Sequence, residues 1–138
     1  MKKIIFLLLF SLLSLYAHQC TEYELDKAEY FANRAAEQIV SNRFDGGQGI
    51  YAKVNSCDYN SYSHQYTLRV EIHWNGEIFA SNHYECDGVL RVNDDGLNPS
   101  FTIEWMNSKL QSYVSDRNLF RFVVGSVIVL GALSQQQN

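Results

Sequence analysis

The clearest structural signal in the chain is the stretch from His64 to Gly76, HQYTLRVEIHWNG. Apolar and polar side chains alternate along it, which is typical of a β-strand with one buried face and one solvated face. Asn75-Gly76 at its end favours a hairpin turn, because both residues readily adopt positive φ angles. The stretch therefore predicts a strand that continues into an antiparallel hairpin. Its buried face would carry Tyr66, Leu68, Val70, Ile72 and Trp74.

The returning strand of this hairpin is expected over Ile78–Cys86. A two-residue turn would place Glu77 and His83 on the apolar face of the hairpin. A three-residue turn with Gly76 in the left-handed conformation instead pairs apolar with apolar residues, so we expect that register. Its pairs are Ile72 with Ile78, Val70 with Ala80, and Tyr66 with Tyr84.

A long helix is expected before the hairpin, over Thr21–Phe44. Thr21 and Glu24 have the capping-box spacing, and apolar residues recur at helical spacing behind them. Further strands are predicted over Ile50–Cys57, Val89–Val92 and Phe101–Trp105, and a short helix over Ser108–Ser115. The fold class is therefore α+β: a long N-terminal helix packed on an antiparallel β-meander of four to five strands, followed by a short helix and an apolar C-terminal segment.

This order of elements is similar to that of the cystatin-like roll, in which a sheet wraps around a helix. The resemblance implies the layout alone. The glutamine-valine-glycine hairpin motif of inhibitory cystatins does not occur in this sequence. No functional residue is therefore transferred from that family.

The N-terminus has the pattern of a secretory signal peptide, predicted over residues 1–17. Lys2 and Lys3 precede an apolar run, Ile4–Leu15, and Ala17 provides a small residue for cleavage. The mature chain would begin at His18, with a single α+β domain over 18–118. We expect a periplasmic or secreted protein in an oxidising environment.

The charge of the chain indicates which class of macromolecule it is not expected to bind. The formal charge of the 138-residue chain is -4, and the chain has no basic cluster outside the predicted signal peptide, which argues against a nucleic-acid partner.

Residues 119–138 form an apolar segment and a polar tail. The apolar part, Leu119–Leu133, is shorter than the roughly 20 residues of a membrane helix. We expect it to be buried or covered by a partner, with membrane contact or a disordered tail as alternatives.

Three cysteines and three histidines are expected at one end of the fold. Successive reversals of the chain would bring Cys20, Cys57 and Cys86 together there, with His18, His64 and His83 nearby. His73 would lie at the opposite end. We predict one disulfide and one free thiol, with all three pairings open. Cys57–Cys86 is disfavoured because the two strands would be roughly 9.6 Å apart, whereas a disulfide needs Cα atoms within about 7 Å.

The same cluster offers a metal site as an alternative. Cysteine and histidine suit zinc or copper, and the free amine and ring of His18 could chelate copper with His64 or His83 as the third ligand. His73 and His83 are predicted not to share a metal, because they are not opposite one another in either hairpin register. Apart from this copper or zinc alternative, no cofactor is expected.

The segment between the first two predicted strands is rich in tyrosine, serine and asparagine. Rigid amphipathic rings and short polar side chains suit the recognition of another macromolecule. The alternative is that Tyr66 packs in the core while Tyr59 and Tyr62 lie over the sheet edge. The predicted binding residues are Tyr59, Asn60, Tyr62, His64 and Tyr66.

We therefore expect an exported small binding protein of the inhibitor or immunity type, with a protein as its partner. A metal- or ligand-binding protein is the alternative, and a membrane-associated accessory protein held by Leu119–Leu133 is third. An enzyme is not expected. His83 and Glu85 share a strand face and could act as a general base, but no activated nucleophile lies nearby in the sequence. The acidic turn Asn93–Gly96 lacks the first aspartate of an EF-hand loop.

Overall fold

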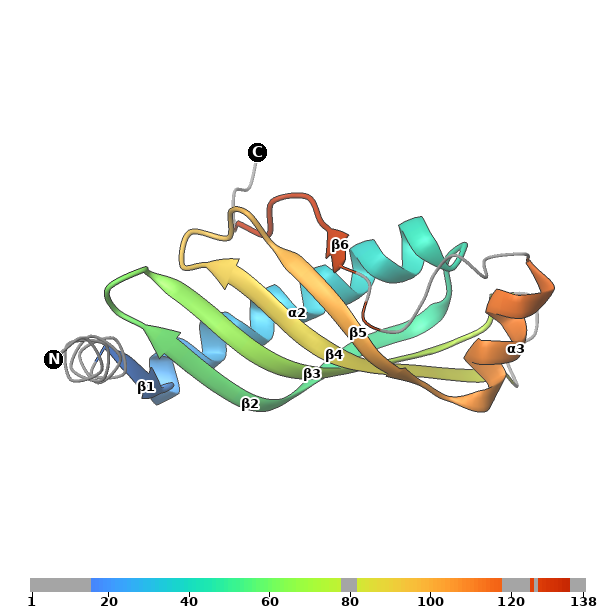
Figure 1. Ribbon diagram of the computed structural model, residues 1–138. Coiled ribbons are helices and arrows are strands. Elements are labelled where there is room, and N and C mark those ends of the chain that lie inside the picture. Colours follow the sequence, from blue (N-terminus) through green and yellow to red (C-terminus); the bar gives the residue numbers. More distant parts are fainter. Residues whose placement is uncertain (1–15, 78–81, 118–124, 126, 135–138) are drawn as a thin grey trace, which may run out of the picture.

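The computed structural model describes residues 16–77, 82–117, 125 and 127–134. All six strands form one antiparallel sheet in the order β1-β2-β3-β4-β5-β6, so neighbours in sequence are neighbours in space (Figure 1). The predicted α+β class is confirmed, with six strands rather than four to five. The elements are β1 (Ala17–Gln19), α2 (Glu22–Arg43), β2 (Gln48–Asn60), β3 (Gln65–Asn75), β4 (His83–Asn93), β5 (Ser100–Met106), α3 (Ser108–Asp116) and β6 (Val127–Val129).

Helix α2 begins and ends where the sequence predicts. Thr21 is the N-cap: its side chain accepts a hydrogen bond from the Glu24 amide, and the Glu24 carboxylate accepts one from the Thr21 amide. Phe44 caps the other end. Asp45 and Gly46 then adopt positive φ angles of 61° and 89°, which turn the chain out of the helix toward β2.

The core lies between α2 and one face of the sheet (Figure 1). Alanines on the buried side of the helix let it approach the strands closely, and every apolar residue predicted for the buried face of β3 is buried. Phe31 of α2 contacts Tyr66 edge to face, and Phe44 stacks on Trp74. Helix α3 packs on the same side, where Tyr113 contacts Tyr84. The polar side chains of β3 and β4 therefore face away from both helices.

The predicted hairpin register is wrong, although the predicted facing of the strand is right. Ile72 pairs with Cys86 rather than Ile78, and β4 begins at His83. The turn is correspondingly longer than three residues: Asn75 pairs with His83, and residues 78–81 of the connection lie outside the described residues. The observed register places Leu90 and Val92 opposite the buried residues of β3, which extends the apolar face of the hairpin.

The C-terminal segment returns to the sheet. Strand β6 pairs with β5, and Ile128 and Leu133 are buried in the core, so the sheet continues past residue 118. The first part of the predicted apolar segment, residues 119–124, lies outside the described residues. Within the described ranges, no helix is both long and apolar enough to cross a membrane. Residues 1–15 of the predicted signal peptide are also outside the description, whereas Ala17 pairs with Asn60 as part of β1.

Candidate functional site

One end of the sheet is closed by a disulfide between Cys20 and Cys57. Their Cα atoms are 5.4 Å apart, and the bond ties the start of α2 to β2. Of the three pairings that the sequence leaves open, the structure contains this one. A disulfide is compatible with an extracellular protein.

The expectation that all three cysteines gather at this end is wrong. Cys57 pairs with Leu68 of β3 and Cys86 pairs with Ile72, which is four residues or about 13 Å further along that strand. The Cys86 thiol is free and wholly buried. Burial, together with the charges of Asp87 and Glu85, raises its pKa far above the ordinary value.

The predicted tyrosine-rich binding residues lie around the turn between β2 and β3. The side-chain oxygen of Asn60 accepts hydrogen bonds from the Tyr62 and Ser63 amides, which shapes the turn. Tyr62 is 70% exposed, and its ring lies 5.4 Å from that of Tyr16. Tyr66 is only 2% exposed and packs in the core, which is the alternative role considered for it.

Tyr59 and His64 form a polar contact with Asp94. The Tyr59 hydroxyl donates to Asp94 Oδ2 over 2.8 Å and lies 3.2 Å from His64 Nδ1. Burial and the Asp94 carboxylate raise the pKa of Tyr59 to about 12. Of the five predicted binding residues, Tyr62 and His64 are exposed, while the other three hold the turn or the core.

The three histidines proposed from the sequence as copper or zinc ligands do not converge. His18 pairs with Glu24, and His64 pairs with Asp94, both at the disulfide end. His83 of β4 lies opposite Asn75 in the sheet, at the far end of β3. Asn75 is nine residues, or about 30 Å, from Tyr66 at the disulfide end of the same strand. His83 therefore cannot share an ion with His18 or His64.

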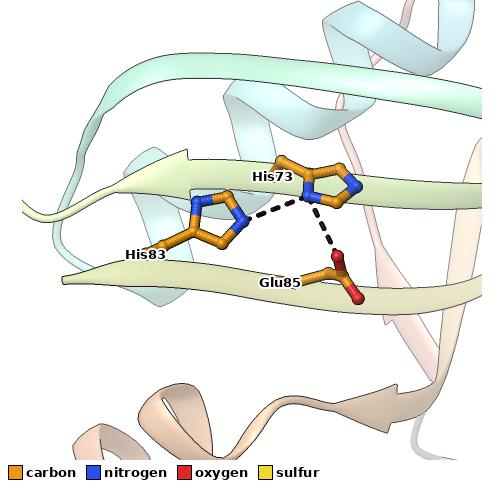
Figure 2. Close-up of side chains that lie close together, drawn as sticks. All are labelled: His73, His83 and Glu85. Atoms are coloured by element: carbon orange, nitrogen blue, oxygen red, sulfur yellow. Dashed lines mark hydrogen bonds and ion pairs between the residues drawn. The ribbon is translucent and has the colours of Figure 1, made fainter.

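The structure instead brings His83 to His73, so the prediction that these two histidines cannot share a metal is wrong. His73 Nδ1 lies 3.3 Å from His83 Nε2 and 3.0 Å from Glu85 Oε1 (Figure 2). The reason is the register: His73 is directly opposite Glu85, and His83 is two residues before Glu85 on the same face of β4. All three side chains project from the polar face of the sheet.

Neighbouring strands hold this group in place. The ring of Tyr51, from β2, stacks on His73 with 4.8 Å between the ring centroids. Glu71 Oε1 lies 3.2 Å from the second nitrogen of His73, whose side chain is only 12% exposed. The Asn55 amide donates to Glu71, and this bond, with the nearby His73 and Lys53, holds the pKa of Glu71 below its ordinary value.

Asp87 extends the group along β4. Its Oδ1 is buried, and it is the only such side-chain atom in the described part of the chain without a hydrogen-bond partner. Burial raises the pKa of Asp87, and the charges of Glu85 and Glu71 raise it further. We name the five residues His73, His83, Glu85, Glu71 and Asp87 the histidine-carboxylate cluster.

The cluster has the chemistry of a metal site. The ligand atoms of His73, His83 and Glu85 lie within 4.8 Å of one another, and so do those of Glu71, Glu85 and Asp87. Two imidazole nitrogens with a carboxylate oxygen are ligands that zinc and copper accept. The sequence signal was the shared polar face of β3 and β4, but the members could be brought together only by the correct hairpin register.

Comparison of the chain with protein-family models, with curated proteins and with solved structures finds no match. The likeness to the cystatin-like roll therefore rests on the order of the elements alone.

Proposed function

We propose that the protein is an exported metal-binding protein that holds a divalent transition-metal ion with His73, His83 and Glu85. The observation that carries this proposal is the position of His73 Nδ1, which lies 3.3 Å from a nitrogen of His83 and 3.0 Å from an oxygen of Glu85. Metal-ligand distances of about 2.0–2.1 Å in a tetrahedral site place neighbouring ligand atoms about 3.3 Å apart. The two measured distances are close to that spacing.

The surroundings of the three ligands support the same function. Tyr51 and Glu71 fix the orientation of the His73 ring, as outer contacts do around metal-bound histidines. Asn75 Oδ1 lies 3.3 Å from His83 Nδ1 and leaves Nε2 for the ion. His83 is exposed, so solvent or a ligand can occupy the remaining coordination positions. An open three-ligand site of this kind suits the exchange of zinc or copper more than a closed structural role.

Calorimetric titration of the purified mature protein with ZnCl2 and with CuCl2 tests the proposal. The native protein should bind at least one of these ions. His83→Ala should weaken binding by about tenfold or more, because it removes one of three protein ligands. His64→Ala is the matched control, since it removes an exposed histidine at the other end of the sheet. Absent binding, or equal binding by both variants, would overturn the proposal.

Recognition of a protein of the inhibitor or immunity type is a second candidate. The observation that favours it is the exposed ring of Tyr62, on a turn that Asn60 shapes a few residues after the disulfide-bonded Cys57. Affinity capture with the native protein and with Tyr62→Ala would test it, and identical captured proteins would contradict it. Membrane association has less support, because Ile128 and Leu133 of the apolar segment are buried in the core.

A further inference from the structure

A cavity lies on the helix side of the sheet, the side opposite to the histidine-carboxylate cluster. Among the described residues it has a volume of about 550 Å³, and it is bounded by α3, by the turn after α2 and by the turn after β3 (Figure 1). Sites for small ligands typically have volumes of about 300–1,000 Å³. The rings of Phe44, Tyr84 and Tyr113 line this cavity, and those of Tyr84 and Tyr113 are 5.7 Å apart. The cavity therefore has an aromatic wall that suits an apolar group.

Contacts between the surrounding elements shape the cavity. The Tyr113 hydroxyl of α3 donates to the carboxylate of Asp45, and Arg117 pairs with the same carboxylate. On the other side, a Cβ atom at Gly46 would lie 3.2 Å from Glu77 Oε2, so the Glu77 carboxylate lies against this glycine. Because Asp45 and Arg117 neutralise one another, neither provides a free charge for a ligand.

Three other charged side chains line the cavity, and none has an ion-pair partner within the described part of the chain: Glu77, Lys109 and Asp116. Lys109 and Asp116 lie on one face of α3. They are seven residues apart, which corresponds to about 10 Å along the helix axis. The cavity therefore has an ammonium group at one end of α3 and a carboxylate at the other.

These two charges are opposite to the ones that stabilise a helix. Lys109 lies in the first turn of α3, and Asp116 is its last residue. The N-terminus of a helix favours negative charge, and the C-terminus favours positive charge. Helix stability therefore does not account for either residue. A ligand with an anion near Lys109 and a cation near Asp116 would compensate both side chains and would itself be oriented favourably in the field of the helix.

We propose that this cavity binds a short peptide with free termini. The peptide carboxylate would pair with Lys109, and its ammonium group would pair with Asp116 and Glu77. An extended tripeptide spans about 10 Å between its terminal charges, which matches the separation of Lys109 and Asp116 along α3. An apolar side chain of the peptide would pack on the rings of Tyr84 and Tyr113. The site shares no residue with the proposed metal site, so each can be tested without the other.

An NMR titration of the isotope-labelled mature protein with the tripeptide alanyl-phenylalanyl-alanine tests the inference. Saturable shifts are expected in the amides of Gly46, Gly76 and Ser112, which line the cavity. Acetylation of the peptide amine and amidation of its carboxylate should each weaken binding by about fivefold, because each removes one charge pair. Glycine in place of the central phenylalanine should also weaken binding, because it removes the apolar contact.

A double-mutant cycle assigns the carboxylate to Lys109. Lys109→Gln should weaken binding of the free peptide by about threefold to fivefold and should leave binding of the amidated peptide unchanged, because that peptide lacks the partner of Lys109. Asp116→Asn combined with Glu77→Gln should behave in the same way toward the acetylated peptide. Lys27→Gln is the control, since the Lys27 ammonium lies over the Phe31 ring of α2 and does not line the cavity.

The proposal would be overturned by the absence of saturable shifts with peptide at about 5 mM, or by shifts confined to residues outside the cavity. Equal binding of the free and amidated peptides would reduce the ligand to an organic cation and would also overturn it. Additive losses from Lys109→Gln and amidation would show that Lys109 does not contact the peptide carboxylate.

Discussion

Tyr59 and Asp94, 35 residues apart in the sequence, are joined by a 2.8 Å hydrogen bond in which the Tyr59 hydroxyl donates to Asp94 Oδ2. The bond links the end of β2 to the turn that follows β4, across the end of β3. The backbone amide of Asp94 also donates to the carbonyl oxygen of His64. This end of the sheet is therefore fixed by side-chain and backbone bonds beside the disulfide.

The hydrogen bond of the Tyr59 hydroxyl should make the stability of the fold decrease at alkaline pH. The pKa of Tyr59 is raised to about 12, so the folded state favours the neutral hydroxyl more than the unfolded state does. Its contribution to the free energy of unfolding is complete below an ordinary tyrosine pKa of about 10, and it is lost as the pH rises toward 12. Urea unfolding across this range should show a smaller loss in Tyr59→Phe than in the native protein. Parallel pH profiles would contradict this assignment.

The disulfide should contribute a large part of the stability. Cys20 and Cys57 are separated by 37 residues, and closure of a loop of that length stabilises a fold by about 3–4 kcal/mol. Reductant should therefore lower the thermal midpoint of the native protein. Cys20→Ala with Cys57→Ala should start at that lower midpoint and show no further change with reductant. If reductant left the thermal midpoint of the native protein unchanged, the disulfide would not stabilise the fold.

The remaining cysteine should behave as an unreactive thiol. Cys86 is buried in the core, and burial raises its pKa, so thiolate is scarce at neutral pH. A thiol reagent should label one site per chain in denaturant and almost none in the native state. Rapid labelling of the native protein, absent in Cys86→Ala, would show that the thiol is accessible.

The sequence predicts the elements well because their signals are local. The capping box at Thr21 and Glu24 lies within one helical turn, and the alternation of β3 lies within one strand. The hairpin register is a different problem. Residues 78–86 and 84–92 place apolar side chains on the same face with the same period, so both pair acceptably with β3. The register with the longer turn is favoured by residues far from the turn, because it places Leu90 opposite Leu68 and Val92 opposite Tyr66.

The candidate metal site depends on that register, which is why the sequence did not reveal it. Glu71 and His73 alternate with the apolar residues of their strand, and His83 and Glu85 share one face of the returning strand. A register in which Ile72 pairs with Ile78 keeps His83 away from His73. The observed register, in which Ile72 pairs with Cys86, places the two rings 5.4 Å apart. An error in one turn length therefore changed the expected site and left the fold class intact.

The packing of β5 on β4 depends on Gly88. A Cβ atom at this position would lie 2.1 Å from the backbone oxygen of Thr102, at the point where the pairing of the two strands is irregular. Because backbone cannot move aside as a side chain can, Gly88→Ala should lower the free energy of unfolding by about 2–3 kcal/mol. Gly131→Ala is the control, since its Cβ would meet only the flexible side chain of Gln38. Chemical denaturation measures both variants. A Gly88→Ala stability within about 0.5 kcal/mol of the native value would show that the strands separate at little cost.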